Sequence, residues 1–410
     1  MKLLIGNGVV GQSGGPTSAI NATLCGVIKG ASVSNAIQTL YGMENGIEGF
    51  LNERLIDLSY LYDNDEALTA LEATPSSALG SCRKRLPNIS NDSEVYKKVL
   101  DIFKRYNIRY FFYIGGNDSM DTACKISQYS KMCHYEINVI GIPKTIDNDI
   151  VLTDHTPGYG SASKYISTTI KEIAKDTSAY QCRAVTIVEI MGRDTGWLTA
   201  SAGLPKYLGS EGADLIYLPE VYFEGDELIT SLNKLLLKKP NIVVAVSEGI
   251  RYDNGKYVGE GTQNGIIDPF GHKYLAGTAK TLEALVRERI GCKVRSVELN
   301  LPQRCASHIA SDTDISESKQ IGSYAVKCAE NNISGKMVAF KRKSGKYQVE
   351  LTTVDVGETV NKVKYVPRNF INKEGNNVTN ECMEYIAPLI LGERNIKYKN
   401  GLPVHYKIRG

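Results

Sequence analysis

The sequence predicts an α/β fold with two Rossmann-like domains, each built around a mainly parallel sheet, and a small antiparallel hairpin near the C-terminus. Short apolar runs alternate with longer amphipathic stretches along the chain, as strands alternate with helices in parallel sheets. The runs are apolar throughout, which is typical of strands covered by helices on both faces. A chain of 410 residues is also long for one hydrophobic core, so two domains are expected.

The apolar runs give the expected strands in order along the chain. They are Leu3–Val10, Tyr110–Ile114, Val139–Ile142, Val185–Ile190, Leu215–Leu218 and Ile242–Val246. Helices are expected at Ser18–Lys29, Val95–Arg105 and Lys164–Lys175. Near the end of the chain, Lys336–Phe340 and Tyr347–Val354 flank a short Ser-Gly-Lys segment, which predicts the antiparallel hairpin.

The composition restricts the class of protein. The formal net charge is +3, with acids and bases mixed along the chain, so neither nucleic acid nor a membrane surface is an expected partner. No apolar stretch is long enough to span a bilayer, and the first residues read as a strand instead of a signal peptide. The 9 cysteines form no Cys-x-x-Cys pair, which argues against zinc, and their odd number predicts free thiols in the cytoplasm.

Polar and glycine-rich clusters follow the expected strands, and a parallel sheet brings such clusters to one edge, where ligands bind. Gly11–Thr17 and Gly115–Ser119 contain adjacent glycines that let backbone N–H groups approach an anion. Gly80–Arg85 holds basic residues suited to phosphate contact. Taken singly, these segments are also explained as a tight turn, a helix cap or a solvated loop.

Two later clusters carry groups suited to chemistry. Pro143–Asp149 combines a lysine, a threonine and two acids. A carboxylate there can accept the proton of an attacking hydroxyl, and the lysine can neutralise phosphate charge. Met191–Trp197 offers a glycine amide and an arginine to a phosphorylated sugar, and Glu248 is suited to sugar hydroxyls. Each segment alone is more often structural, but their shared position at strand ends predicts one site.

In their order along the chain, these segments resemble the phosphofructokinase family, from about Leu3 to Ala387. The matching motifs are Gly14-Gly15-Pro16, Gly80-Ser81-Cys82-Arg83, Gly115-Gly116, Pro143–Asp149, Met191–Arg193 and Gln303-Arg304. The Lys-Thr-Ile-Asp-Asn-Asp and Met-Gly-Arg segments are specific when they occur together. The resemblance implies Mg²⁺-dependent, reversible transfer of a terminal phosphoryl group to the 1-hydroxyl of fructose 6-phosphate, a step of glycolysis.

The resemblance also implies roles for individual residues. The catalytic set would be Asp147 as the base, with Lys144, Thr145 and Arg193. The phosphoryl donor would contact Gly15, Arg83, Gly116, Asp118 and Ser119. Fructose 6-phosphate would contact Thr145, Asp147, Asp149, Met191, Gly192, Arg193, Glu248, Arg295 and Arg304. An arginine such as Arg295 often reaches the site from a neighbouring subunit in this family, which implies a homodimer or homotetramer.

Within this scheme each domain would hold one ligand. The first domain, residues 1–150 and about 290–340, would bind the phosphoryl donor. The second domain, residues 151–289 and the C-terminal segment, would bind fructose 6-phosphate.

Two residues favour pyrophosphate over ATP as the donor. Asp118 stands where ATP-using members of the family carry glycine, and its carboxylate fills space and repels the α-phosphate of ATP. Lys144 replaces another glycine and supplies a fixed cation for a donor that lacks a nucleoside. Mg²⁺ would be held by Asn117, Asp118 and Asp149, although Asn117 replaces the usual aspartate with a weaker, neutral ligand.

Other departures and alternatives stay open. Leu301 stands where the family carries a histidine, and Arg183 lies one residue out of register, which on a strand turns the side chain to the other face. An ATP-dependent phosphofructokinase is the nearest alternative, and sedoheptulose 7-phosphate is an alternative acceptor. A non-catalytic regulatory subunit would lack the catalytic residues present here. A dinucleotide-dependent oxidoreductase would need a Gly-x-Gly-x-x-Gly fingerprint, which the first turn lacks.

Overall fold

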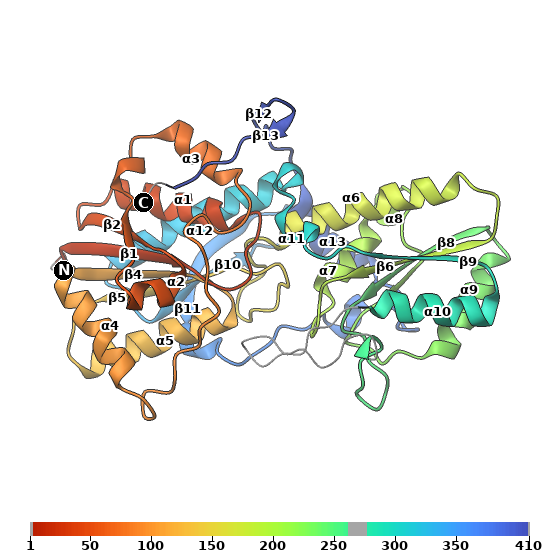
Figure 1. Cartoon of the computed structure of the whole chain (residues 1–410), viewed down its shortest axis with the longest axis horizontal. Helices are drawn as coiled ribbons and strands as arrows, with labels where there is room; N and C mark the ends of the chain where they lie inside the picture. Colours follow the sequence, from red (N-terminus) through yellow and green to blue (C-terminus); the bar gives the residue numbers. More distant parts are fainter. Residues whose placement is uncertain (1–2, 261–276, 409–410) are drawn as a thin grey trace.

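The computed structural model describes residues 3–260 and 277–408, which contain two main sheets. The two sheets, each with its covering helices, lie end to end along the longest axis of the molecule (Figure 1). A separate pair of short strands, β12 (Tyr398–Lys399) and β13 (Leu402–Pro403), is formed near the C-terminus. Among the described residues, none of the helices is long and apolar enough to cross a membrane.

The larger sheet has seven strands in the order β11-β10-β5-β4-β1-β2-β3. Its strands are β1 (Gly6–Gln12), β2 (Ile37–Met43), β3 (Leu55–Asp57), β4 (Ile108–Gly115), β5 (Asn138–Pro143), β10 (Lys336–Arg342) and β11 (Val349–Asp355). Neighbouring strands are parallel except at the two edges, where β3 pairs antiparallel with β2 and β11 with β10. The central strands are almost entirely buried, as expected of a parallel sheet covered on both faces.

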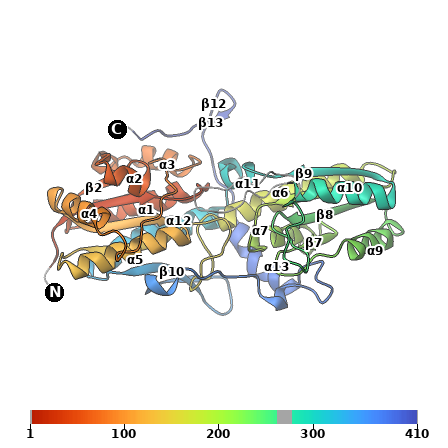
Figure 2. The same cartoon turned by 60° about the horizontal axis from the view of Figure 1, so that its bottom comes forward.

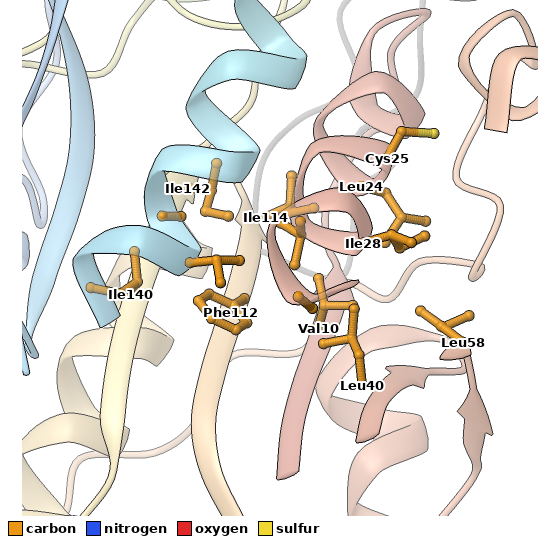
Figure 3. Close-up of a cluster of buried hydrophobic side chains, with 14 of the residues drawn as sticks. Val10, Leu24, Cys25, Ile28, Leu40, Leu58, Phe112, Ile114, Ile140 and Ile142 are labelled. Carbon is orange, nitrogen blue, oxygen red and sulfur yellow. The ribbon is translucent and has the colours of Figure 1, made fainter. Parts of the chain in front are cut away.

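Helices cover both faces of this sheet. One face carries α1 (Ile20–Ser32), α3 (Asp65–Glu72) and α12 (Asp312–Glu330). The other carries α2 (Gly46–Leu51), α4 (Glu94–Arg105) and α5 (Asn117–Met132). Figure 3 shows Val10 beneath Leu24 and Ile28 of α1, whereas Phe112 and Ile140 on the neighbouring strands lie beneath α12. This apolar contact fixes the turn that joins β1 to α1.

Glycines bring α1 and α12 into close contact. A Cβ atom added to Gly26 would lie 2.1 Å from the carbonyl oxygen of Lys319, and one added to Gly322 would lie 2.3 Å from that of Thr23. Ser323 donates a hydrogen bond from its Oγ to the carbonyl of Gly26 at 2.8 Å. The backbones of α1 and α12 are therefore in direct contact at Gly26 and Gly322, and a residue with a side chain at either position would push the two helices apart.

The smaller sheet has four parallel strands in the order β7-β8-β6-β9. They are β6 (Ala184–Ile190), β7 (Leu215–Tyr217), β8 (Asn241–Ser247) and β9 (Lys293–Glu298). One face packs against α6 (Tyr159–Ser178), α7 (Trp197–Ala200), α8 (Leu204–Tyr207) and α13 (Asn380–Ile386). The other packs against α9 (Gly225–Leu236) and α10 (Thr278–Ile290), and α11 (Pro302–Cys305) follows β9.

The predicted α/β class is confirmed, and each expected strand and helix is present with shifted ends. The first strand begins at Gly6 instead of Leu3, because Leu3 and Ile5 are exposed and lie before the first paired residue. The expected hairpin is β10 and β11. The edge strand β9 was not expected, because its exposed face interrupts the apolar pattern. The predicted division into two domains stays a prediction; β9, although it follows residue 290, pairs with β6 of the smaller sheet.

Candidate active site

A pocket of about 860 Å³ lies between the two sheets, where the carboxyl ends of their strands face each other. Segments that follow β1, β4 and β5 line one side, and segments that follow β6, β8 and β9 line the other. The predicted residues that line it are Gly15, Arg83, Gly116, Asn117, Asp118, Ser119, Lys144, Thr145, Asp147, Asp149, Met191, Arg193, Glu248 and Arg304. Parallel strands thus gather residues from distant parts of the sequence at one place.

Cations surround the glycine turn that follows β1. Lys144 Nζ donates a hydrogen bond to the carbonyl of Gly15 at 2.7 Å, and only 2% of this lysine is exposed. A Cβ atom on Gly15 would lie 3.2 Å from Arg304 Nη1 and 4.0 Å from Arg83 Nη2. Burial lowers the pKa of Lys144 to about 8, with Asp147 opposing that shift. The turn therefore offers a positively charged cradle for a phosphate group.

The loop after β5 holds Asp147 by contacts on both of its sides. The backbone N–H of Asp147 donates to Thr145 Oγ1 at 3.1 Å, and Thr195 Oγ1 donates to the carbonyl of Asp147 at 3.2 Å. Burial raises the pKa of the Asp147 carboxyl, while the charges of Arg193 and Lys144 lower it. The loop therefore brings into the pocket a carboxyl group near two cations, and such a group can accept a proton.

Asn117 and Asp149 form the part of the pocket that fits a divalent cation. Asn117 Nδ2 donates a hydrogen bond to Asp149 Oδ2 at 3.0 Å. The amide oxygen, Asn117 Oδ1, takes no part in this bond. This oxygen is buried and has no hydrogen-bond partner within the described part of the chain. Burial, together with Asp147, raises the pKa of Asp149 to about 7. Oxygen ligands of this kind suit Mg²⁺, which usually completes its shell with water and phosphate oxygens.

Asp118, the third predicted metal ligand, is engaged elsewhere. Its Oδ1 pairs with Arg85, 2.8 Å from Nε and 2.6 Å from Nη2. In residues 3–260 and 277–408, no cluster of three or more acidic, histidine or cysteine side chains is arranged to hold a metal. Asn117 Oδ1 and Asp149 are therefore better placed than Asp118 for this role.

The loops after β6 and β8 form the opposite wall. Gly192 donates its backbone N–H to Glu248 Oε1 at 3.2 Å, and Met191 donates to Gln303 Oε1 at 3.2 Å. The φ of Gly192 is +144°, and a Cβ atom there would lie 2.5 Å from the carbonyl of Thr195, so only glycine fits. Burial raises the pKa of Glu248 to about 8.

Arg193 lines the pocket and carries a hydrogen-bond donor that the described part of the protein does not use. Its Nη1 is buried and lacks a hydrogen-bond partner among the described residues. Buried donors are almost always paired, so an unpaired guanidinium nitrogen in a pocket indicates a place for a ligand oxygen.

Two predicted residues do not line the pocket. Gly192 contributes instead through its bond to Glu248. Arg295 is exposed on β9 and borders a separate small cavity with Tyr180 and Lys293. A single chain therefore does not bring Arg295 to this site. Leu301, which replaces the family's histidine, lines the pocket as an apolar and half-exposed side chain.

The pocket also contains residues that the sequence reading missed. They are Glu189, Glu298 and Asn300 at the ends of β6 and β9, and Asn361, Lys362 and Val363 from a segment after β11. Glu189 could have been identified from the sequence, because it is an acidic residue inside a mostly apolar strand. The segment after β11 had none, since it follows an antiparallel edge strand and lies in no helix or strand.

Comparison with known proteins identifies relatives of this chain. A family model described as phosphofructokinase matches residues 7–329. The pyrophosphate–fructose 6-phosphate 1-phosphotransferase of Halomonas elongata is 38% identical over 97% of this chain and 94% of its own length. The pyrophosphate–fructose 6-phosphate 1-phosphotransferase of Methylococcus capsulatus is also 38% identical, over 97% of this chain and 94% of its own length. The crystal structure of a pyrophosphate-dependent phosphofructokinase from Nitrosospira multiformis superposes with a TM-score of 0.88 at 36% identity, covering 98% of this chain and 96% of that one. The chain belongs to the phosphofructokinase family.

Proposed function

We propose that this protein transfers a phosphoryl group from pyrophosphate to the 1-hydroxyl of fructose 6-phosphate. The observation that carries the proposal is the buried Lys144, which lies 2.7 Å from the carbonyl of Gly15 at a turn that Arg304 and Arg83 also approach. Asp118 lines the same side of the pocket, and its carboxylate would repel the α-phosphate of a nucleotide. The relatives and solved structures named above carry the same activity in their names.

The acceptor hydroxyl would lose its proton to Asp147. The Thr145 and Thr195 contacts hold the backbone of Asp147 in place, and the neighbouring cations favour the ionised form of its carboxyl. Arg193, whose Nη1 is unpaired among the described residues, would bind the phosphoryl oxygens as negative charge moves between donor and acceptor. In-line transfer of this kind needs no covalent intermediate on the protein.

The donor would bind at the cationic cradle. Lys144, Arg83 and Arg304 would neutralise its oxygens, while Gly15, Gly116 and Ser119 let the chain approach closely. Mg²⁺ would be held by Asn117 Oδ1 and Asp149, with Asp118 kept nearby by Arg85. When bound, the ion would draw charge from the pyrophosphate oxygens and so assist the departure of phosphate.

Fructose 6-phosphate would bind at the opposite wall. Glu248 and Met191 would contact its hydroxyls, with Gly192 positioning Glu248 and with Arg193 and Arg304 near its charged groups. Arg295, which a single chain does not bring to the pocket, would serve the site of a neighbouring copy in a homo-oligomer.

The test compares phosphoryl donors and acceptors with the purified full chain. With Mg²⁺ and fructose 6-phosphate, we expect kcat/KM for pyrophosphate to exceed that for ATP by at least about 100-fold, which corresponds to about 2.7 kcal/mol. Sedoheptulose 7-phosphate serves as the alternative acceptor. Turnover with ATP that equals or exceeds turnover with pyrophosphate would overturn the donor assignment, and the absence of turnover with both donors would overturn the activity.

A further inference from the structure

The segment of residues 359–366, here called the strap, joins the two halves of the molecule along one side of the pocket. It follows β11 and a 3₁₀ turn, η5 (Val356–Glu358), and leads toward α13 beside the smaller sheet (Figure 2). Val356 belongs to the same buried cluster as Met120 of α5, so the strap leaves the larger sheet on the α5 side. Three of its residues, Asn361, Lys362 and Val363, line the pocket.

Backbone hydrogen bonds hold the strap against loops that follow strands of both sheets. Lys364 donates its N–H to the carbonyl of Asp149 at 2.8 Å, and its carbonyl accepts from Trp197 Nε1 at 2.8 Å. Val366 donates its N–H to Glu220 Oε1 at 3.0 Å, and the same carboxylate accepts from the N–H of Gly196. The strap is therefore fixed just beyond the residues that line the pocket.

The side chain of Lys364 adds a second set of contacts with the loop that carries Asp147. Its Nζ donates to Asn148 Oδ1 at 2.9 Å and to the carbonyls of Asp154 and Thr153 at 2.8 and 3.2 Å. It also lies 5.4 Å from the centre of the Trp197 ring, within the range of a cation–π contact. One lysine thus connects the strap to the loop after β5 at several points.

Lys362 enters the pocket at the end where the donor is expected. The strap passes from the α5 side to Asp149, and Asp149 is bonded to Asn117 at the start of α5. The helix that Asn117 begins follows β4 of the larger sheet, whereas the sugar wall belongs to the smaller sheet. The Lys362 side chain is exposed and has no hydrogen-bond or ion-pair partner among the described residues, so its ammonium is free to bind a ligand in the pocket.

We infer that Lys362 is a further binding residue for the phosphoryl donor, held at the pocket by Lys364 as a positioning residue. This inference rests on the proposed function. An ammonium on a flexible stem suits the outer oxygens of pyrophosphate, and it would hold the phosphate that leaves. Lys144 is buried deep at the glycine turn, so Lys362 would contact the donor from the solvent side.

The test measures Lys362→Met against a matched control. Lys346→Met removes an exposed lysine from the β10–β11 turn, outside the pocket. For Lys362→Met we expect the KM for pyrophosphate to rise about tenfold, as for loss of one charge-assisted hydrogen bond, with the KM for fructose 6-phosphate changing less than about twofold. Lys362→Arg is expected to recover most of the affinity. The control variant should match the unaltered protein in both constants.

Calorimetric binding of pyrophosphate with Mg²⁺ gives a second readout that does not depend on turnover. If the protein binds pyrophosphate but does not transfer its phosphoryl group, the proposed activity fails. The effect of Lys362→Met on binding can still be measured in that case, so the two failures are distinguishable. An unchanged dissociation constant for Lys362→Met overturns the inference. A rise confined to the KM for fructose 6-phosphate also overturns it, because Lys362 would then serve the sugar.

The role of Lys364 is tested by a double-mutant cycle. Lys364→Met releases the strap, so we expect it to weaken pyrophosphate binding and to remove most of the additional effect of Lys362→Met. If the loss of pyrophosphate binding free energy in the double variant equals the sum of the losses in the two single variants, Lys364 does not act through Lys362. Thermal unfolding of each variant separates this coupling from a general loss of the fold.

Discussion

The two ends of the pocket differ in charge, although both are built from loops that follow parallel strands. The donor end gathers Lys144, Arg83 and Arg304 around a glycine turn. The sugar end contains the carboxyl groups of Glu189, Glu248 and Glu298. A polyanionic donor needs cations along its whole length, whereas sugar hydroxyls need hydrogen-bond acceptors. The contrast shows that the same edge of a fold can recognise different ligands when only the side chains at the strand ends change.

The largest expected effect comes from Asp147, which lies where the two ends meet. Asp147→Asn keeps the shape of the side chain but removes the proton acceptor, so kcat should fall by roughly 10²–10⁴-fold. The KM values for both substrates should change little, because the amide preserves the contacts of the loop. Steady-state kinetics checks the result, and Asp101→Asn on the exposed side of α4 serves as the control. A kcat within threefold of the unaltered protein would contradict the assignment.

The donor end should lose affinity as the solution becomes more alkaline. Burial lowers the pKa of Lys144 to about 8, so its ammonium predominates below pH 8 and is lost as the pH rises through that value. The dissociation constant for pyrophosphate should then rise by up to about tenfold per pH unit. In Lys144→Arg the guanidinium stays protonated, so the loss of pyrophosphate affinity should begin at a higher pH. Equal pH profiles for the two proteins would show that Lys144 is not the titrating group.

The sugar end should respond to changes at Glu248 without affecting the donor. Glu248→Ala removes an acceptor for sugar hydroxyls, so the KM for fructose 6-phosphate should rise about tenfold. Because burial raises the pKa of Glu248 to about 8, its carboxyl is mostly protonated at pH 7, and Glu248→Gln should stay within about threefold of the unaltered protein. If Glu248→Ala raised the KM for pyrophosphate as much as the KM for fructose 6-phosphate, the two ends of the pocket would not bind the two ligands separately.

The smallest effect is expected at the rim of the donor end. Arg85 pairs with Asp118 in a partly exposed ion pair, which is worth less than about 1 kcal/mol of unfolding free energy. Arg85→Ala leaves the Asp118 charge near the donor, so the KM for pyrophosphate should rise about twofold to fivefold at low ionic strength and recover at high salt. An effect that does not depend on salt would indicate a direct contact between Arg85 and the donor.

The sequence was informative wherever a functional residue directly follows a parallel strand. Lys144 and Asp147 follow β5, Arg193 follows β6 and Glu248 follows β8, and all four line one pocket as expected. The pattern of buried strands predicts this convergence, because the carboxyl ends of neighbouring parallel strands share one edge. The α/β class was predictable for the same reason.

Other features depend on pairing between distant loops, which the sequence does not encode locally. The ion pair of Asp118 with Arg85 and the bond of Asn117 to Asp149 appear only after the loops are placed in space. Lys362 follows an antiparallel edge strand and gave no strand-end signal. The edge strand β9 was missed because one of its faces is exposed, so its residues do not form an apolar run.

The close contact between α1 and α12 has a consequence for how the protein is made. Ser323 bonds to Gly26 across 297 residues of sequence, so α1 leaves the ribosome long before its partner helix exists. At about 5–20 residues per second, the apolar side of α1 waits about 15–60 s for α12. During that interval the nascent chain exposes the side of α1 that α12 covers in the folded protein, so we expect newly synthesised chains to depend on chaperones more than refolded ones do.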